Sequence, residues 1–478
     1  MTGEYDLVII GGSYAARYAA GMAVQQRVRV ALVEPDLVEI QPFSWGEIYQ
    51  AHLRSPASRN IYTENLQNLQ NLQSGDLEIV GNLERTGDNF GGAWRSFLQY
   101  SQTAANFLQE EFDLASLSRA GVDVIVGRGE FQQGSRRSAL AFVVDKRILR
   151  SRRYLLATEL ISAPPSIPGL EEASYLTPAD LSKNLTANSW IVMGNPYPAA
   201  EISLMLRGLG KAVTLISPKR QLFPQEEPIA NALIQGELEA AGILLLTNSP
   251  VALIRYLEGK SWVQAGDRAI EAEQLLLCPR QIYQTRGLNL ATAGVQTNKY
   301  GVVVNQYLQT TNPRIYAWSD PQNSALAEVQ TALKNALMLP LFSFNSLHQP
   351  RITHTQPTLA RIGMTEQEAR QKHGQSVTIL REYVKNQPLA QMRGETTGFC
   401  QLVVGRNGKI LGATVLAAQG AELMTAIALA INTGLKVGDL ARIPETNGSL
   451  LQRTAAQGRS KHPQFDSIWQ EIMKRFKV

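Results

Sequence analysis

One strand–turn–helix–strand pattern occurs twice in the sequence, and this repeat limits the possible folds more than any other feature. In the first copy, a β-prone run at residues 6–10 leads to a turn at Gly11, and an alanine-rich helix is followed by a strand that ends at Glu34. The second copy has the same order, from a turn at Gly194 to a strand that ends at Ser217. In each copy the strand ends 23 positions after the turn glycine, and the copies lie 183 positions apart. Two βαβ units with equal internal spacing predict two Rossmann-like domains of the nucleotide-binding type.

The first turn carries most of the pattern that a dinucleotide requires. Such a turn needs glycine where the chain bends and small residues where the backbone approaches a pyrophosphate. Gly11 stands at the bend and Gly12 follows it, Ser13 takes the second glycine position, and Ala16 is an accepted residue at the third. Glu34 ends the second strand, where an acidic residue accepts hydrogen bonds from a ribose diol. The pattern predicts nucleotide binding, and the alternative is a βαβ unit that has kept only its shape.

The second turn departs from this pattern. Pro196 occupies the approach position and Pro198 follows two residues later, and proline has no backbone N–H to direct at a phosphate. The strand ends without an acidic residue, so a ribose diol lacks its usual partner. Two interpretations stay open: an inherited fold without a nicotinamide cofactor, or an NADPH site in which Ser217, Lys219 and Arg220 hold the 2′-phosphate.

The composition narrows the function classes. With 478 residues, the chain is long enough for about three domains. Its 46 basic and 41 acidic residues leave a net charge of only +5, which gives no electrostatic footprint for nucleic acid. Two cysteines far apart and five histidines without ligand spacing argue against a disulfide scaffold, an iron–sulfur cluster and a local metal site.

The sequence shows no signal for export or membrane insertion. No run of 18 or more apolar residues occurs, which predicts that no segment spans a membrane. The N-terminus has no basic segment ahead of an apolar core, so we expect no signal peptide and a cytoplasmic protein.

Several motifs farther along the chain occur in the order seen in one known family. Residues 311–320 resemble the second FAD motif of this family, where Asp320 would accept hydrogen bonds from the ribityl chain of the cofactor. Residues 365–370 and 394–399 resemble two signatures of its dimerisation domain. Together with the two βαβ units, these motifs make residues 5 to about 458 similar to the FAD-dependent pyridine nucleotide–disulfide oxidoreductases, such as dihydrolipoamide dehydrogenase and mercuric reductase.

This resemblance implies an α/β fold with two Rossmann-like dinucleotide-binding domains, of the FAD and NAD(P) types, and a C-terminal α+β dimerisation domain. It also implies a homodimer, with the FAD domain split around the NAD(P)-type domain. The implied parts are a first FAD part at 1–170, an NAD(P)-type domain at 171–290, a second FAD part at 291–347, a dimerisation domain at 348–458 and a tail helix at 459–478.

The chain departs from the family at the residues that reduce disulfides. Family members carry a C-x4-C redox pair on a helix shortly after the first βαβ unit, and residues 41–50 here contain no cysteine. Cys278 and Cys400 fall in strand-like segments, where a buried inert thiol is the expected state. The family's His and Glu dyad, which the partner subunit contributes, aligns with Asn447 and Gln452, and these amides cannot exchange protons near neutral pH. These departures predict that disulfide reduction is lost.

Two further turns of the family, with the pattern A-T-G, pack against its cofactors. The first reads Ala157-Thr158-Glu159 here, and Glu159 brings a carboxylate towards the pyrophosphate of FAD unless an arginine neutralises it. The second reads Cys278-Pro279-Arg280 and contains no glycine. Because the changes are heavier on the nicotinamide half, the resemblance favours FAD over NADP as the retained cofactor.

Residues 459–478 form an amphipathic pattern. Large apolar residues recur there at intervals of three and four, which predicts a helix with one apolar face. Lys474, Arg475 and Lys477 flank its end. Three interpretations stay open: packing on its own subunit, docking to a partner protein, and attachment to an acidic membrane surface. The apolar positions are Phe465, Ile468, Trp469, Ile472, Met473 and Phe476.

Three hypotheses for function follow. The first is an FAD-binding flavoprotein with the disulfide-oxidoreductase fold but no disulfide-reducing chemistry, its activity lost or narrowed. The second is an active FAD oxidoreductase that takes electrons from NADPH and passes them to a quinone, a small carrier or oxygen. The third is a cofactor-free scaffold dimer. Hydride transfer to flavin is the chemistry of the cofactor itself, so no catalytic residue is predicted, and whether the protein is an enzyme stays open.

Overall fold

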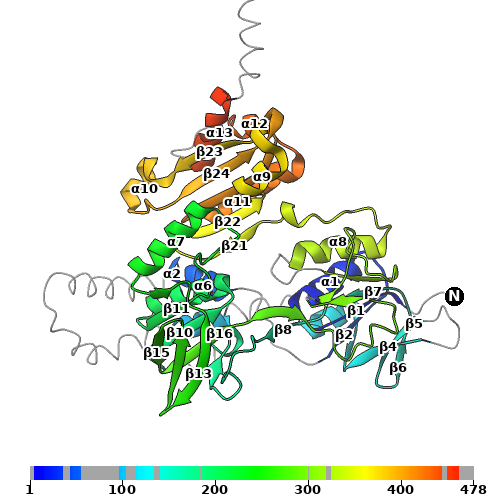
Figure 1. Cartoon of the computed structure of the whole chain (residues 1–478). Helices are drawn as coiled ribbons and strands as arrows, with labels where there is room; N and C mark the ends of the chain where they lie inside the picture. The colour runs from blue at the N-terminus through cyan, green and yellow to red at the C-terminus, as the bar shows by residue number, and fades with distance from the viewer. Residues whose placement is uncertain are drawn as a thin grey trace, which may run out of the picture. The chain divides into compact units, whose positions relative to one another are not determined.

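The computed structural model describes residues 5–35, 44–54, 96–103, 113–133, 140–181, 186–299, 301–318, 325–443 and 449–461. Their contacts form two units, and Figure 1 labels many of their helices and strands. Unit 1 contains the described residues up to 35, those of 96–165 and those of 279–346. Unit 2 contains the described residues of 44–54, 166–278 and 347–461.

Unit 1 is built on a five-stranded parallel sheet with the strand order β20-β7-β1-β2-β3. Successive side chains of a strand point to opposite faces, and β1 obeys this rule: Leu7 and Ile9 join one core, and Val8 and Ile10 join another. The strands are β1 (Tyr5–Ile10), β2 (Val30–Glu34), β3 (Asp123–Val126), β7 (Ser151–Leu156) and β20 (Ile315–Ala317).

Helices and a small sheet cover the two faces of this parallel sheet. The alanine face of α1 and the apolar face of α8 belong to the core of Leu7 and Ile9. The antiparallel strands β4, β5 and β6 supply Phe131, Phe142 and Leu149 to the other core. The bounds are α1 (Tyr14–Gln25), α5 (Leu114–Arg119), α8 (Ala325–Leu337), β4 (Gly129–Gln133), β5 (Leu140–Val144) and β6 (Arg147–Leu149). Two short pairs complete the unit, β8 (Leu160–Ala163) with β17 (Arg280–Tyr283) and β18 (Thr297–Asn298) with β19 (Gly301–Val302).

The first half of unit 2 repeats the parallel architecture, with the strand order β12-β11-β10-β16-β9. Helix α6 packs against β10 and β11, and the antiparallel strands β13–β15 cover the face that carries Ile191 and Met193. The strands are β9 (Tyr175–Leu176), β10 (Ser189–Gly194), β11 (Ala212–Ile216), β12 (Leu244–Leu246), β13 (Val251–Leu257), β14 (Lys260–Ala265), β15 (Arg268–Ala272) and β16 (Gln274–Cys278). The helices are α2 (Trp45–Arg54), α6 (Pro196–Gly208) and α7 (Pro228–Ala240).

The second half of unit 2 is an antiparallel sheet with the order β21-β22-β25-β24-β23, covered by helices. Helix α11 packs on β22 and β25, and α13 packs on β23 and β24. The strands are β21 (Arg351–Thr353), β22 (Thr358–Gly363), β23 (Thr378–Tyr383), β24 (Phe399–Val404) and β25 (Ile410–Ala417). The helices are α9 (Glu366–His373), α10 (Pro388–Arg393), α11 (Gly420–Thr433), α12 (Val437–Leu440) and α13 (Leu450–Lys461).

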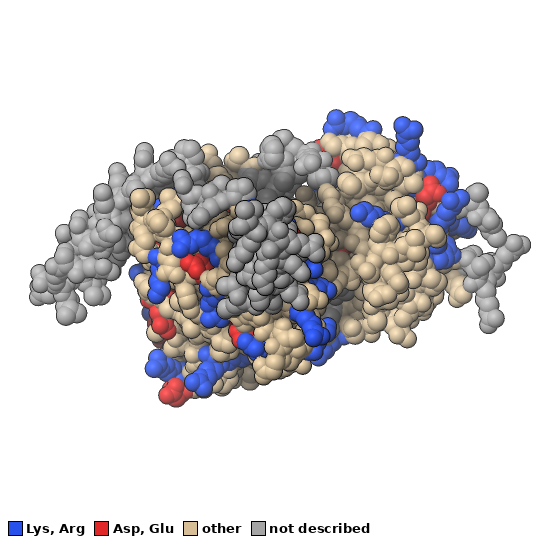
Figure 2. Space-filling view, turned by 90° about the horizontal axis from the view of Figure 1, so that it is seen from above, with Lys and Arg blue, Asp and Glu red and all other residues tan. Residues whose placement is uncertain are grey.

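The predicted fold class is confirmed, with two parallel sheets built on βαβ units and a C-terminal α+β part. The two predicted repeats are β1–α1–β2 and β10–α6–β11. The domain boundaries stay a prediction, and residues 462–478 of the tail helix predicted at 459–478 lie outside the described residues. No helix among the described residues is long and apolar enough to cross a membrane. On the face drawn in Figure 2, Lys and Arg side chains are dispersed in small groups, several of them beside Asp or Glu.

Candidate functional site

The first turn lies where the central strand β1 ends between β2 and β7. Gly11 has a φ of +137°, and a Cβ atom at this position would lie 2.0 Å from the carbonyl oxygen of Ala157. The Gly11 N–H donates to the carbonyl of Val33 over 2.8 Å, which ties the turn to the end of β2. Only glycine fits this bend, as predicted, because a side chain would meet backbone rather than a movable group.

Ser13 begins helix α1 as its N-cap. Its hydroxyl accepts a hydrogen bond from the Ala16 N–H over 3.1 Å and donates to the Ala157 carbonyl over 2.9 Å. The cap satisfies one of the N–H groups that a helix start leaves without a partner. Ala16 is fully buried, which explains why a small residue occupies the third glycine position.

Glu34 is fully buried at the end of β2 and pairs with Arg17, which the sequence reasoning missed. The Arg17 Nε donates to Glu34 Oε2 over 3.2 Å, and its Nη2 donates to Oε1. Such a bidentate arrangement offsets the cost of burying both charges. The signal was present in the sequence: Arg17 is the one charged residue of an alanine-rich helix face. The ribose contact expected of Glu34 stays a prediction.

Glu159 follows β7 and reaches the turn, as its place in the sequence suggested. A Cβ atom at Gly12 would lie 2.7 Å from the Glu159 Oε1 and 2.8 Å from the Glu34 Cγ. Gly12 is therefore flanked by two carboxylate-bearing side chains. The Glu159 carbonyl accepts a hydrogen bond from the Gln284 N–H over 2.9 Å, which extends the pairing of β8 with β17.

A cavity of about 290 Å³ opens at this edge of the parallel sheet. Ligands of doubly wound folds bind outside the carboxyl ends of the strands, and the cavity has this position. Its lining includes Gly11, Gly127, Arg128, Glu159 and Arg286. Arginine remains charged at all physiological pH values, so two cations and one carboxylate face the space. The residues present therefore fit the adenosine and pyrophosphate half of FAD.

The predicted site residues come together only in part. Gly11, Gly12, Ser13, Ala16 and Glu34 all lie at the start of α1 or the end of β2, within unit 1. Asp320, predicted to bind the ribityl chain, lies outside the described residues, as does Asn447. Their roles stay predictions.

The second turn has the same bend but a different helix start. Gly194 has a φ of +116°, and a Cβ atom there would lie 2.1 Å from the carbonyl oxygen of Cys278. Pro196 and Pro198 supply no N–H, and Asn195 Oδ1 accepts the Tyr197 N–H between them over 3.4 Å. The first three residues of α6 therefore offer no N–H to an anion, whereas a phosphate site at a helix start depends on such donors.

The residues suggested for a 2′-phosphate follow β11. The hydroxyl of the buried Ser217 accepts a hydrogen bond from the Lys219 N–H over 3.3 Å. Lys219 and Arg220 are exposed. Lys219 and Arg220 thus lie on the surface of this loop, whereas the Ser217 hydroxyl is engaged in a hydrogen bond within the loop.

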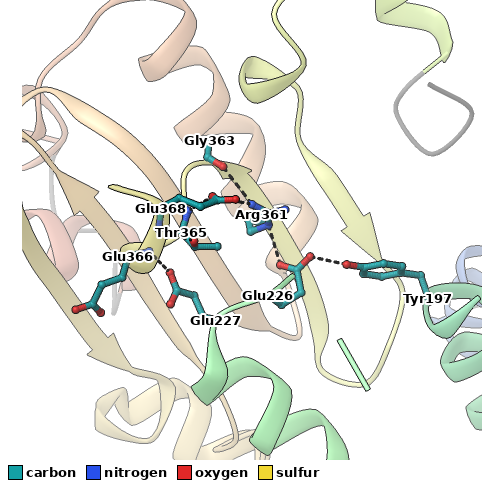
Figure 3. A network of polar contacts seen from close by, with 8 residues as sticks. All are labelled: Tyr197, Glu226, Glu227, Arg361, Gly363, Thr365, Glu366 and Glu368. Atoms are coloured by element: carbon teal, nitrogen blue, oxygen red, sulfur yellow. Dashed lines mark hydrogen bonds and ion pairs between the residues drawn. The ribbon is translucent and has the colours of Figure 1, made fainter. Parts of the chain in front are cut away.

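A buried polar network begins at Tyr197 of the second turn, as Figure 3 shows. The Tyr197 hydroxyl donates to Glu226 Oε1 over 2.9 Å, and Glu226 Oε2 lies 2.8 Å from the Nε of Arg361, on β22. The side chains of Glu226 and Arg361 are only 2% and 8% exposed. Burial and the neighbouring Glu226 carboxylate raise the pKa of Tyr197 above its ordinary value, so the phenol keeps its proton.

The next residue extends this network to α9. Glu227 Oε1 accepts the Glu366 N–H at the start of α9 over 2.6 Å. Thr365 and Glu368 cap the same helix start, since the Glu368 N–H donates to the Thr365 hydroxyl and the Thr365 N–H donates to Glu368. The paired glutamates before α7 therefore hold β22 and α9 to the second turn.

Both cysteines are buried and free, as predicted. Cys278 ends β16 and is 1% exposed, and Cys400 lies fully buried in β24. Burial raises the pKa of Cys278 and raises that of Cys400 to about 12. The thiolate is the reactive form, so neither sulfur has the state that disulfide exchange requires.

Helix α2, in the region where the family carries its redox pair, packs instead on a buried carboxylate. Glu201 on α6 accepts the His354 N–H over 2.6 Å and is 5% exposed. A Cβ atom at Gly46 would lie 2.8 Å from the Glu201 Cβ, so glycine permits the close approach of the two helices. Burial raises the pKa of Glu201 to about 7. Hydrogen bonds from His354 and Ser44 act in the opposite direction and lower this pKa. Sequence reasoning missed Glu201, although it is the one acidic residue of an apolar helix.

Comparisons with known proteins agree with this architecture. A family model described as pyridine nucleotide-disulphide oxidoreductase matches residues 5–336, and the model of the corresponding dimerisation domain matches residues 349–446. The chain belongs to the pyridine nucleotide-disulphide oxidoreductase family. The family is FAD-dependent and uses NAD(P)H, and the dimerisation domain supports a homodimer.

Mercuric reductases are among the relatives of this family member. The chain is 30% identical over 453 residues to mercuric reductase from Staphylococcus aureus, covering 92% of this chain and 79% of the relative. Two solved structures share the fold at 20% identity: LpdA from Mycobacterium tuberculosis and the HOCl-induced flavoprotein disulfide reductase RclA from Escherichia coli. Their TM-scores are 0.79 and 0.72, and each comparison covers 94% of this chain and 99% or 98% of the other.

Proposed function

We propose that this chain is a flavoprotein that binds FAD at the first turn and does not reduce disulfides. The observation that carries the proposal is the burial of both cysteine thiols. The only two cysteines of the sequence are buried in strands, and the described part of α2 contains none. A family member without an accessible thiolate has no nucleophile for disulfide exchange.

The first turn supplies the groups that would hold the cofactor. Gly11 lines the cavity and Ser13 caps the helix that begins after the turn, and Arg128 and Arg286 line the space where the pyrophosphate would be received. Asp320 is the residue proposed for the ribityl chain. Bound FAD would supply hydride and electron transfer, which no side chain of this protein can perform.

A second candidate is an NADPH-dependent oxidoreductase that passes electrons to a quinone, a small carrier or oxygen. Exposed Lys219 and Arg220 directly after β11 favour it, because two cations suit a 2′-phosphate. The prolines of the second turn oppose it, since they remove the donors that a pyrophosphate needs.

One spectroscopic experiment on the purified full chain separates these functions. We expect a flavin absorption band at one FAD per chain, no bleaching when NADPH is added without oxygen, and no NADPH consumption with glutathione disulfide or Hg²⁺. Rapid bleaching by NADPH would favour the second candidate. Release of thiols from a disulfide substrate would contradict the proposal. A colourless protein that fails to take up FAD would also contradict it and would favour the hypothesis of a cofactor-free scaffold dimer.

A further inference from the structure

We propose that three side chains set the affinity of the first turn for an adenine dinucleotide: Arg128 and Arg286 attract its pyrophosphate, and Glu159 opposes it. The inference rests on the proposed function, because it concerns how the same cavity receives FAD. All three residues line that cavity.

Glu159 is placed to oppose a pyrophosphate by the turn itself. Its Oε1 lies 2.7 Å from the position of a Cβ atom on Gly12, the residue between the bend at Gly11 and the approach position at Ser13. A carboxylate beside a bound pyrophosphate repels it, and the repulsion grows as the site loses water.

Arg286 lies on the loop that follows β17, and Gln284 of this loop is hydrogen-bonded to the backbone of Glu159. The Gln284 N–H donates to the Glu159 carbonyl over 2.9 Å, and the Arg286 N–H donates to the Gln284 Oε1 over 3.2 Å. The loop that carries Arg286 is therefore fastened to the backbone of Glu159.

Arg128 stands between two glycines on the loop from β3 to β4. The Gly127 N–H donates to the Glu34 carbonyl over 2.8 Å, and a Cβ atom on Gly129 would lie 2.5 Å from the Phe142 ring. The loop backbone is thus fixed at both ends while its one long side chain lines the cavity.

The charge balance explains why the arginines are needed. Glu34 forms its bidentate pair with Arg17, so this carboxylate is already matched by a cation. The cavity lining then includes Arg128, Arg286 and Glu159, and the ligand that it would receive carries two negative charges. Removing Glu159 therefore raises the attraction, and removing either arginine lowers it.

The test titrates the full-length apoprotein with FAD, ADP and adenosine, and measures each dissociation constant. ADP keeps the pyrophosphate and adenosine lacks it. We expect Glu159→Gln to tighten FAD and ADP about tenfold, and Arg286→Gln or Arg128→Gln to weaken them about tenfold, with adenosine unchanged in each case. The matched controls are Glu130→Gln and Arg152→Gln, which change the same charges on exposed side chains of unit 1 outside the cavity lining.

The outcomes separate this inference from the proposed function. Unchanged ADP affinity in Glu159→Gln and Arg286→Gln, or equal changes for adenosine and ADP, would overturn the inference. ADP constants that move as expected in a protein that takes up no FAD would support the inference and overturn the proposed function. Failure of every variant to bind either nucleotide would overturn both. If Arg286→Gln does not fold, Arg286→Lys replaces it, and its ADP dissociation constant is measured as a function of salt concentration. Because lysine keeps the positive charge, we expect a constant within about threefold of the wild-type value and the same salt dependence.

Discussion

The two turns share one backbone and differ in what their helix starts present. Both bend at a glycine of positive φ that packs against a strand carbonyl, Gly11 on Ala157 and Gly194 on Cys278. Beyond the bend, the first turn opens on a cavity, whereas the second places two prolines around a single N–H that Asn195 accepts. The scaffold alone therefore does not make a nucleotide site. Whether such a turn can bind a nucleotide depends on the N–H donors available at the helix start and on the charges around it.

The helices after the turns each bury one ionisable side chain, and the two side chains have different partners. Helix α1 buries Arg17, which pairs with Glu34 of the neighbouring strand. Helix α6 buries Glu201, whose hydrogen-bond partners are the His354 N–H and the Ser44 hydroxyl rather than a guanidinium. The first turn thus stays connected to its own βαβ unit, and the second is connected through Tyr197 and Glu226 to β22 of the antiparallel sheet. We interpret the second turn as a structural junction.

The largest effect should come from Arg361→Met. This change leaves the buried Glu226 carboxylate without its cation, and breaking such a pair costs about 3–5 kcal/mol of unfolding free energy. Urea unfolding measures the loss. The control Arg370→Met removes an exposed partner, 2.9 Å from Glu366, and should cost less than about 1 kcal/mol.

A second substitution tests whether the buried charge causes that loss. Glu226→Gln in the Arg361→Met background should recover part of the stability, because a neutral amide needs no cation and still accepts the Tyr197 hydroxyl. Equal losses for Arg361→Met and Arg370→Met would show that the second turn is not tied to β22 in this way.

The pH dependence of stability should reveal Glu201 behind the second turn. The folded pKa of Glu201 is about 7, above the ordinary value of 4.5, so the folded state keeps a proton that the unfolded chain has released. Stability from this group is therefore full below about pH 4.5 and is lost as the pH rises through 7. The side chain of Glu201→Gln cannot titrate in this range. Between pH 5 and 8 the unfolding free energy of the wild type should therefore fall by roughly 2–3 kcal/mol more than that of the variant.

The exposed Glu239 on α7 provides the control for this measurement. Glu239→Gln should follow the wild-type pH profile. A wild-type profile as flat as that of Glu201→Gln would mean that the carboxyl is ionised in the folded protein, and that α2 packs on a charge.

The sequence was sufficient to predict the architecture but only part of the site. Repeats of fixed spacing and the order of motifs predicted both parallel sheets, because strand–turn–helix signals are local. The pair of Arg17 with Glu34 joins residues 17 positions apart on different elements, and the pair of Glu226 with Arg361 joins the loop before α7 to strand β22. Such partners depend on tertiary packing, and in the sequence each is only a charged residue in an apolar or loop segment.

The smallest effect should come from Tyr197→Phe, and it bears most directly on the comparison of the two turns. The variant loses the 2.9 Å hydrogen bond to Glu226 and keeps the ring contact with Phe223, whose centroid is 5.1 Å away. The unfolding free energy should fall by about 1.5 kcal/mol, as expected for a hydrogen bond to a charged acceptor. Tyr256→Phe, on a tyrosine that is 46% exposed, should change it by less than about 0.5 kcal/mol.

The same variant distinguishes two explanations for a second turn that binds no nucleotide: a site covered by the Tyr197 side chain, and a helix start that lacks N–H donors. If Tyr197 merely covered a working nucleotide site, releasing it from Glu226 would allow NADPH to bind, and calorimetric titration would detect binding in Tyr197→Phe but not in the wild type. The prolines predict otherwise, because a freed phenyl ring restores no N–H at Pro196 or Pro198. We therefore expect no binding in either protein, and binding in the variant alone would contradict the view that the two turns differ in their donors.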